Sequence, residues 1–123
     1  MKSVFELKRA ADGRFVFNLK AANDQVILSS QTYETKESAE GGIASIKQNA
    51  AIDAHYEEKT GNDGLPYFVL HAANRLVIGR SQMYSSREAM HKGIASVKHN
   101  APIAETVDLS AQVRSAGGRG SRG

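Results

Sequence analysis

The stretch GIASIKQNA at residues 42–50 returns almost unchanged as GIASVKHNA at residues 93–101. The two stretches lie 51 positions apart, and the same offset relates FNLKAAN at residues 17–23 to FVLHAAN at residues 68–74. A constant offset without insertions indicates that one structural unit occurs twice along the chain. The repeat therefore decides how the rest of the sequence is interpreted.

Each repeat carries the signals of several strands followed by a helix. Asp12-Gly13 marks a tight turn, because glycine tolerates the positive φ that hairpin turns need. Alternation over residues 15–21 puts apolar side chains on one face of a strand and polar ones on the other. Thr35 can cap a helix over residues 36–48, and Ser86 takes the same place in the second repeat. The chain becomes extended again after each helix, so each repeat reads β-β-β-α-β.

Three strands and one helix bury too little apolar surface to be stable alone. We therefore expect one compact α+β domain over residues 1–109, built from repeats at about 1–51 and 52–109, with both helices on one face of a shared sheet. Gly42 and Gly93 recur on the apolar helix face, which predicts a helix backbone close against that sheet.

The motifs FxLKAAN, SQxY and GIAS[IV]KxNA closely resemble those of the YegP-like family of small bacterial proteins. The resemblance covers about residues 3–108. It implies two tandem β-β-β-α-β repeats about a pseudo-twofold axis, which share one mainly antiparallel sheet and exchange their last strands. It also implies a single-copy form that dimerises to build the same object, but it implies no function.

The second repeat departs from the first at two places. Pro66 replaces the aromatic found at Phe15, and Gly79-Arg80 replaces Leu28-Ser29. Proline cannot donate to a strand ladder, so we expect an edge or a bulge at Pro66.

Composition limits the classes of function. The chain has 16 basic and 13 acidic residues, but three arginines lie in residues 110–123, so the remainder is balanced. We predict that this Gly/Arg/Ser segment is a disordered tail. No apolar run is long enough to span a membrane. The lack of cysteine fits a reducing compartment, and we predict a cytoplasmic protein.

Chemistry-bearing residues do not form a recognisable catalytic or metal-binding motif. The four histidines have no metal-ligand spacing and no counterparts in the other repeat. Glu37 and Glu88 are explained by the positive helix N-terminus. Glu6 with Lys8 predicts an ion pair along one strand, as do their counterparts in the second repeat. We therefore predict no catalytic, cofactor-binding or metal-binding residues, and a protein that is not an enzyme.

The face of the sheet away from the helices is the candidate ligand surface. Its predicted residues are polar, basic or aromatic: Lys8, Asn18, Lys20, Lys59, Tyr67 and His71. The recurrent Lys47/Asn49 and Lys98/Asn100 at the helix ends form a second candidate, although helix capping by left-handed asparagines would explain it.

Two hypotheses for function follow. The first is a non-catalytic protein-interaction module, which uses the sheet or its exposed edge strands to bind a protein partner. The alternative is a nucleic-acid-binding accessory protein that uses the open sheet face and the basic tail to bind single strands weakly. Because two halves complete one sheet, we expect a monomer with an internal pseudo-twofold.

Overall fold

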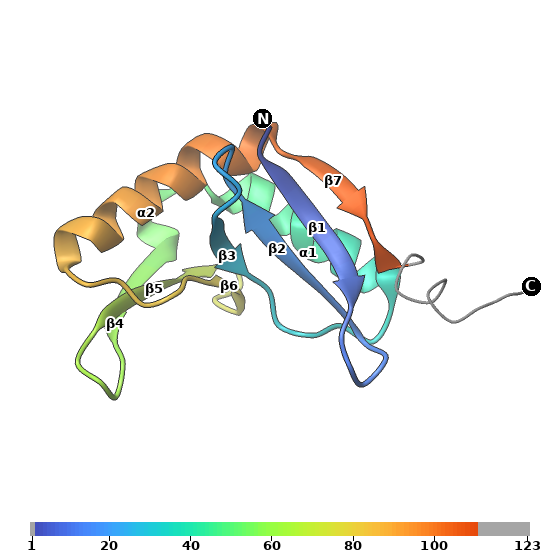
Figure 1. Ribbon diagram of the computed structural model, residues 1–123, viewed down its shortest axis with the longest axis horizontal. Helices are drawn as coiled ribbons and strands as arrows, with labels where there is room; N and C mark the ends of the chain where they lie inside the picture. The colour runs from blue at the N-terminus through green and yellow to red at the C-terminus, as the bar shows by residue number, and fades with distance from the viewer. Residues whose placement is uncertain (1, 111–123) are drawn as a thin grey trace, which may run out of the picture.

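The computed structural model describes residues 2–110 of the 123-residue chain. Within these residues a β-β-β-α unit occurs twice and a final strand follows (Figure 1). The elements in chain order are β1 (Val4–Arg9), β2 (Phe15–Lys20), β3 (Val26–Ser29), α1 (Lys36–Asn49), β4 (Tyr56–Thr60), β5 (Pro66–His71), β6 (Val77–Arg80), α2 (Arg87–Asn100) and β7 (Glu105–Asp108). Among the described helices, none combines the length and the apolarity that a bilayer crossing needs.

All the strands belong to one sheet with the order β4-β5-β6-β3-β2-β1-β7. Neighbouring strands are antiparallel except β1 and β7, which run parallel with Val4 opposite Glu105 and Leu7 opposite Asp108. β7 follows the helix of the second repeat but completes the sheet of the first (Figure 1). The shared, mainly antiparallel sheet and the exchange of a last strand are thus confirmed.

The two halves meet at β3 and β6, which share one opposed residue pair, Ser29 and Arg80. These residues hold the same position in the two repeats, 51 apart, so the pseudo-twofold axis passes between them. Beside them, a Cβ on Gly79 would lie 2.6 Å from Cδ2 of Leu28. One leucine and one glycine fit at the axis where two leucines would collide. The departure at residues 79–80 is therefore a feature of the junction between the halves.

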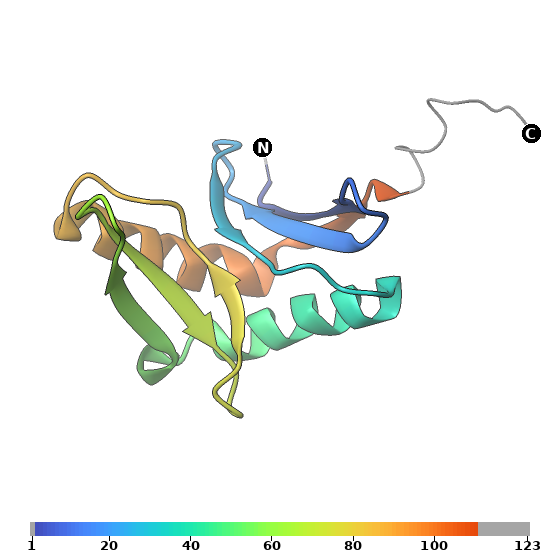
Figure 2. The same ribbon diagram turned by 90° about the horizontal axis from the view of Figure 1, so that it is seen from below.

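Both helices pack against one face of the sheet, and the sheet twists so strongly that the strands of its halves run in different directions (Figure 2). α1 contacts β2 of its own repeat and β5 and β6 of the other, while α2 contacts β5 and β3. Because each helix bridges both halves, the core is continuous. Its largest fully buried side chains include Phe5, Phe17 and Phe68, each contributing about 1.5–3 kcal/mol of hydrophobic stabilisation.

The recurrent helix glycines serve a different contact from the predicted one. A Cβ on Gly42 would lie 2.4 Å from the Tyr33 hydroxyl oxygen, and one on Gly93 would lie 2.1 Å from that of Tyr84. The lack of a side chain at each glycine therefore leaves room for a tyrosine ring. The atoms nearest to each glycine's Cβ position belong to that tyrosine and not to the backbone of the sheet. Tyr33 stacks in turn on a core phenylalanine with ring centroids 6.0 Å apart, and Tyr84 does so at 6.2 Å.

Local signals were confirmed at the helix starts and tight turns. Oγ1 of Thr35 accepts from the Ser38 N–H, and Ser86 caps α2 in the same way. Gly13 and Gly64 have positive φ, of 87° and 81°.

The prediction of left-handed asparagine caps was wrong. Asn49 and Asn100 are buried last residues of the helices, and the cap residues Ala50 and Ala101 that follow are right-handed. The side-chain Nδ2 of Asn49 donates to the Ser45 carbonyl at 2.7 Å, and Asn100 repeats this bond. Each asparagine thus satisfies a carbonyl of its own helix.

Pro66 is neither on an edge strand nor in a bulge, because it begins β5, which lies between β4 and β6. Its carbonyl still accepts from the Tyr84 N–H at 2.9 Å. In the first repeat Phe15 and Tyr33 exchange two backbone bonds at this point, so proline removes one of them.

The last strand covers only Glu105–Asp108, because residues 101–103 before it form a 3-10 turn. Ser110 is buried and its N–H and Oγ both bond to Asp108. Beyond Ser110, the predicted disordered tail lies outside the described residues.

Candidate functional site

The six predicted ligand residues lie on the face of the sheet opposite the helices, called the open face below. They do not converge. Lys8, Asn18 and Lys20 belong to β1 and β2, whereas the other three belong to β4 and β5. Strands β3 and β6 separate the two groups.

In the first repeat, Lys20 is held by two carboxylates. Its Nζ lies 3.3 Å from Glu6 and 3.5 Å from Asp24. The hydrogen bond to Glu6 raises the pKa of Lys20, so this group stays charged. The predicted pairing of Glu6 with Lys8 was wrong, since Glu6 reaches across to β2. Asn18 accepts a hydrogen bond from the Ser29 hydroxyl at 2.8 Å.

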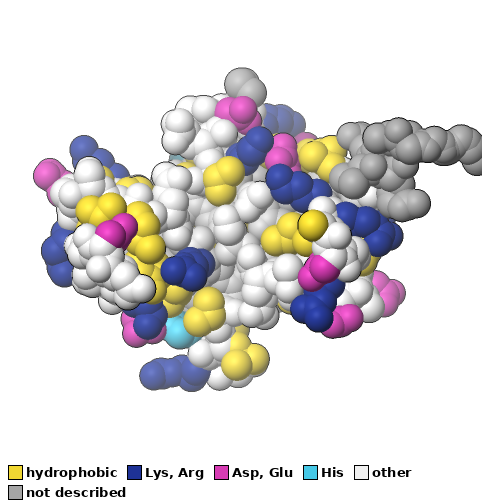
Figure 3. Space-filling model, turned by 60° about the horizontal axis from the view of Figure 1, so that its bottom comes forward, with side chains coloured by type: hydrophobic (Ala, Val, Ile, Leu, Met, Phe, Trp, Pro, Cys, Tyr) yellow, Lys and Arg dark blue, Asp and Glu magenta, His cyan; other side chains and the backbone are white. Residues whose placement is uncertain are grey.

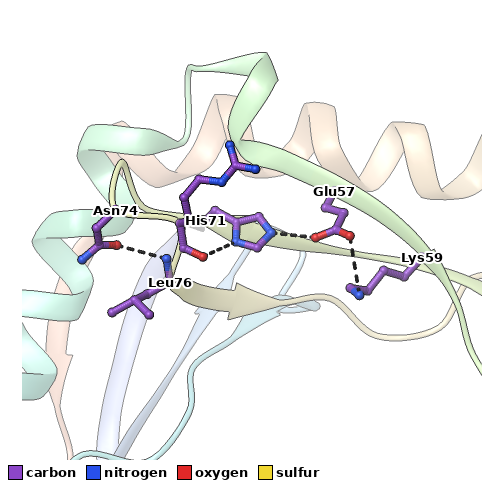
Figure 4. Close-up of polar contacts among 6 residues, drawn as sticks. Glu57, Lys59, His71, Asn74 and Leu76 are labelled. Carbon is purple, nitrogen blue, oxygen red and sulfur yellow. Dashed lines mark hydrogen bonds and ion pairs between the residues drawn. The ribbon is translucent and has the colours of Figure 1, made fainter.

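The second repeat holds an equivalent cluster around Glu57 (Figure 4). Nε2 of His71 lies 2.8 Å from Oε1 of Glu57, and Nζ of Lys59 lies 3.6 Å from Oε2. Nδ1 of His71 contacts the Arg75 carbonyl oxygen at 2.9 Å. The hydrogen bond with His71 first, and then the charge of Lys59, lower the pKa of Glu57. His71 occupies the position of Lys20, and each contacts the glutamate of its first strand.

The charges of this face are therefore largely balanced within the protein. The side shown in Figure 3 has Lys and Arg side chains scattered among Asp and Glu, without a continuous basic patch. Phosphate binding depends on cations that can neutralise a backbone of negative charge. Cations already paired with carboxylates serve this purpose poorly.

Tyr67 differs from the other predicted residues because it meets a cation that has no carboxylate. The Arg80 guanidinium lies over the Tyr67 ring, 4.8 Å from its centroid. Among the described residues, Arg80 makes no ion pair with an acid. Arg80 is exposed, on the pseudo-twofold axis.

A groove runs along the junction between the halves at this point. Its volume is about 480 Å³, and we call it the seam groove; its lining is Val26, Ser29, Ser30, Gln31, Val77, Gly79, Arg80, Ser81 and Gln82. A neighbouring hollow of about 370 Å³ is lined by Tyr67 and Met83 and shares Arg80 with the seam groove. Val77 and Met83 are 40% and 38% exposed, so apolar surface flanks the cation.

The serines of the repeated SQxY motif are structural. Ser30 Oγ accepts from the Phe17 N–H and donates to the Gln31 carbonyl, and Ser81 makes the same two bonds in the second repeat. The glutamines that follow them are exposed and line the seam groove from its two sides.

Arg80, Val77 and Met83 were missed as site residues from the sequence. The available signal was that Gly79-Arg80 replaces Leu28-Ser29. Arg80 lies opposite its own counterpart, Ser29, so this difference between the repeats makes the junction asymmetric.

Elsewhere, the described residues contain no group of three His, Asp or Glu side chains placed to hold a metal ion. At the helix ends, Lys47 and Lys98 lie 5.9 Å and 5.8 Å from the ring centroids of Phe5 and Tyr56. The contacts that recur at the helix ends thus lie within each repeat, whereas Asn49 also contacts His55 of the second repeat at 2.7 Å.

The sequence matches the family model described as "Domain of unknown function (DUF1508)" twice, at residues 10–57 and 62–108. The chain therefore belongs to the DUF1508 family, as a member with two tandem copies of the domain. Its fold matches those of two solved structures of related proteins, with TM-scores of 0.85 and 0.84 at 41% and 44% identity.

Among its relatives, a UPF0339 protein of Bordetella pertussis is 50% identical over 108 residues, covering 88% of this chain and 96% of the relative. The UPF0339 protein YegP of Escherichia coli is 48% identical over 100 residues, covering 81% and 91%. The solution structure of a UPF0339 protein from Shewanella oneidensis superposes with a TM-score of 0.85 at 41% identity, covering 91% of this chain and 95% of that one. These names assign no activity, so the family is one of unknown function.

Proposed function

We propose that the protein is a non-catalytic protein-interaction module that binds a partner through the seam groove. The observation that carries this proposal is the pair of Arg80 and Tyr67, stacked at 4.8 Å beside that groove. Arginine and tyrosine are enriched among the residues that dominate binding energy at protein interfaces. A stacked guanidinium is also held in place before the partner arrives, which lowers the entropic cost of binding.

Apolar surface supports a protein partner over a small charged ligand. Val77 and Met83 flank Arg80 and are both more than a third exposed. Apolar side chains next to an Arg–Tyr pair have the composition of an interface core. The partner that fits this surface offers a carboxylate to Arg80 and an apolar side chain to the groove.

Nucleic-acid binding on the open face is less well supported. Lys20, Lys59 and His71 each contact a carboxylate. Phosphates arriving here would meet Glu6 and Glu57 at the same positions. A single aromatic, Tyr67, also makes a small stacking platform compared with the several bases that single-strand binders stack.

Site-specific photo-crosslinking tests the proposal. A photoreactive amino acid is placed at Val77 or Gln31, on opposite sides of the groove, and at Glu40 on α1 as a control. In a lysate of the source cells, the first two positions should capture one and the same protein, and excess unlabelled chain should compete. Equal capture from Glu40, or different proteins from the two groove positions, would count against the seam groove.

The nucleic-acid alternative has its own readout. Amide shifts of the full chain are followed during titration with short single-stranded DNA and RNA at two salt concentrations. We expect no saturable shifts at Lys20, Tyr67 and His71. Shifts at these residues that weaken with salt would favour the alternative, because phosphate contacts release counterions.

A further inference from the structure

The internal symmetry leaves one edge of the sheet without its strand. β1 lies between β2 and β7, whereas its counterpart β4 pairs, among the described residues, with β5 alone. The segment that corresponds to β7 in the first repeat is residues 54–57, and it runs directly into β4. It cannot lie beside the strand that it forms. The place equivalent to that of β7 is therefore open along β4.

The backbone of β4 presents hydrogen-bonding groups to this open side. Phe68 directs its N–H and C=O towards β6, where both bond to Ser81 at 2.9 Å. Glu58 lies opposite Phe68 in the antiparallel pair, so its own N–H and C=O point outward. In the first repeat the equivalent carbonyl, that of Leu7, accepts from the Leu109 N–H at 2.7 Å. The pairing of β7 with β1 thus shows the hydrogen bonds that a strand beside β4 could form.

There is also room for a strand beside β4. A groove of about 370 Å³ lies between β4 and α2, lined by Asp53, Tyr56, Glu58, His91, Ile94, Ala95 and Lys98. In the first repeat, Leu7 and Ile43 hold the positions of Glu58 and Ile94 and are 0% and 4% exposed. The side chain of Glu58 is 37% exposed. The space that β7 covers in one half is uncovered in the other.

One residue changes what this space accepts. On the covered edge Asp108 of β7 lies opposite Leu7 and bonds to Lys36 at 2.8 Å. On the open edge Glu58 replaces Leu7 and pairs at 2.9 Å with Arg87, which replaces Lys36. His91 contacts the other oxygen of Glu58 at 2.8 Å. In the first half, Lys36 bonds to Asp108 of β7. In the second half, the equivalent Arg87 already pairs with Glu58 of its own repeat.

An acidic residue arriving opposite Glu58 would place two carboxylates side by side, which is destabilising in a strand pair. A lysine or arginine there would meet an opposite charge. Arg87 is 72% exposed and can move aside at little cost, because exposed ion pairs contribute little stability.

We propose that the outer edge of β4 is an acceptor site for an extended segment of a partner protein, which runs parallel to β4 and carries Lys or Arg opposite Glu58. Glu58 also disfavours the exchange of β7 between copies, in which β7 would leave its own β1 and place Asp108 opposite Glu58 of the neighbour, and so prevents head-to-tail growth of chains. The inference rests on the proposed role as an interaction module, but it uses a surface separate from the seam groove.

Two capped peptides test the site on the full chain. One has the sequence of residues 104–109, Ala-Glu-Thr-Val-Asp-Leu, and the other carries the exchange Asp108→Lys. Amide shifts over residues 56–60 and at Ile94 report binding. We expect the lysine peptide to bind roughly three- to tenfold more tightly, as the change of one cross-strand charge pair implies. N-methylation of its last leucine should abolish binding, because that N–H would donate to the Glu58 carbonyl.

The variant Glu58→Leu supplies the matched comparison. It recreates the covered edge, so the aspartate peptide should become the tighter binder and the full chain should self-associate in sedimentation while the wild type does not. Equal affinities in the wild type, shifts only at residues other than 56–60 and Ile94, or indifference to N-methylation would overturn the edge site. Shifts confined to the seam groove would overturn the edge site and leave the proposed function intact. Shifts along β4 together with failed crosslinking from the seam groove would support the edge site and count against the seam groove.

Discussion

At the scale of single residues, the two repeats share a contact between a tyrosine and a helix glycine. Tyr33 with Gly42, and Tyr84 with Gly93, form the same contact twice. A tyrosine hydroxyl occupies the space in which a helix residue would carry its Cβ. Such a contact needs both partners, so each pair recurs as a unit.

Replacing this glycine tests the contact. Gly93→Ala should lower the free energy of unfolding by about 1–3 kcal/mol, because overpacking against Tyr84 outweighs the gain in helix propensity. Gly41→Ala is the control, since nothing lies within 4 Å of its Cβ position, and it should raise that free energy by about 1 kcal/mol. Urea unfolding measures both variants. Stabilisation by both would show that the tyrosine can move without cost.

The junction between the halves offers a second test at this scale. Gly79→Leu should destabilise the protein, because its side chain would meet Leu28 at the axis. Adding Leu28→Gly should recover part of the loss, with a coupling energy of about 0.5–3 kcal/mol in a double-mutant cycle. Simple additivity of the two changes in unfolding free energy would contradict the proposed complementarity.

At the scale of elements, β7 is held partly by an ion pair. Asp108 bonds first to Lys36 and then to Ser110, and these bonds lower its pKa from 3.8 to about 2. A carboxyl with a lowered pKa stabilises the fold above its ordinary pKa and loses that contribution as the pH falls through its folded value.

The stability difference between wild type and Asp108→Asn should therefore be constant above about pH 4 and shrink between about pH 3.8 and 2. Urea unfolding at a series of pH values measures it, and an NMR titration of the carboxyl gives the pKa directly. A carboxyl that titrates near 3.8 would mean that Lys36 does not hold β7 in solution.

Much of the element order could be predicted from the sequence, because the signals are local. The turn at Gly13, the cap at Thr35 and the alternation in β2 depend on neighbouring residues. The seam groove could not be predicted, because it depends on which residues meet across the axis. Arg80 lies 13 positions from Tyr67 in sequence, and only the pairing of strands brings the two together. The contacts of Glu6 with Lys20 and of Glu57 with His71 likewise depend on strand pairing, whereas the predicted pair of Glu57 with Lys59 lies along one strand and was confirmed.

At the scale of the whole molecule, the exchanged strand makes the halves interdependent. β7 belongs to the second repeat but pairs with β1, where Leu7 is fully buried. Each helix also bridges both halves of the sheet. Neither repeat has a complete core of its own.

A chain that ends at Ala104 should consequently lose structure in both halves together. Amide exchange reports this through Phe17 in the first half and Phe68 in the second, whose N–H groups bond to Ser30 and Ser81. We expect protection to fall at both sites by the same factor. Loss at Phe17 with full protection at Phe68 would show that the second half folds independently.

The measurement that tests the proposed function most directly is crosslinking from Val77 in the variant Arg80→Ser, which makes the central pair of the seam groove symmetric with Ser29. Lys92→Ser on α2 is the control for removing an exposed cation. Arg80 is exposed and loses only its contact with the Tyr67 ring, so the unfolding free energy should change by no more than about 1 kcal/mol. We predict that Arg80→Ser reduces capture of the partner about tenfold or more while Lys92→Ser does not. Undiminished capture by a stable Arg80→Ser variant would contradict the assignment of the seam groove as the binding site.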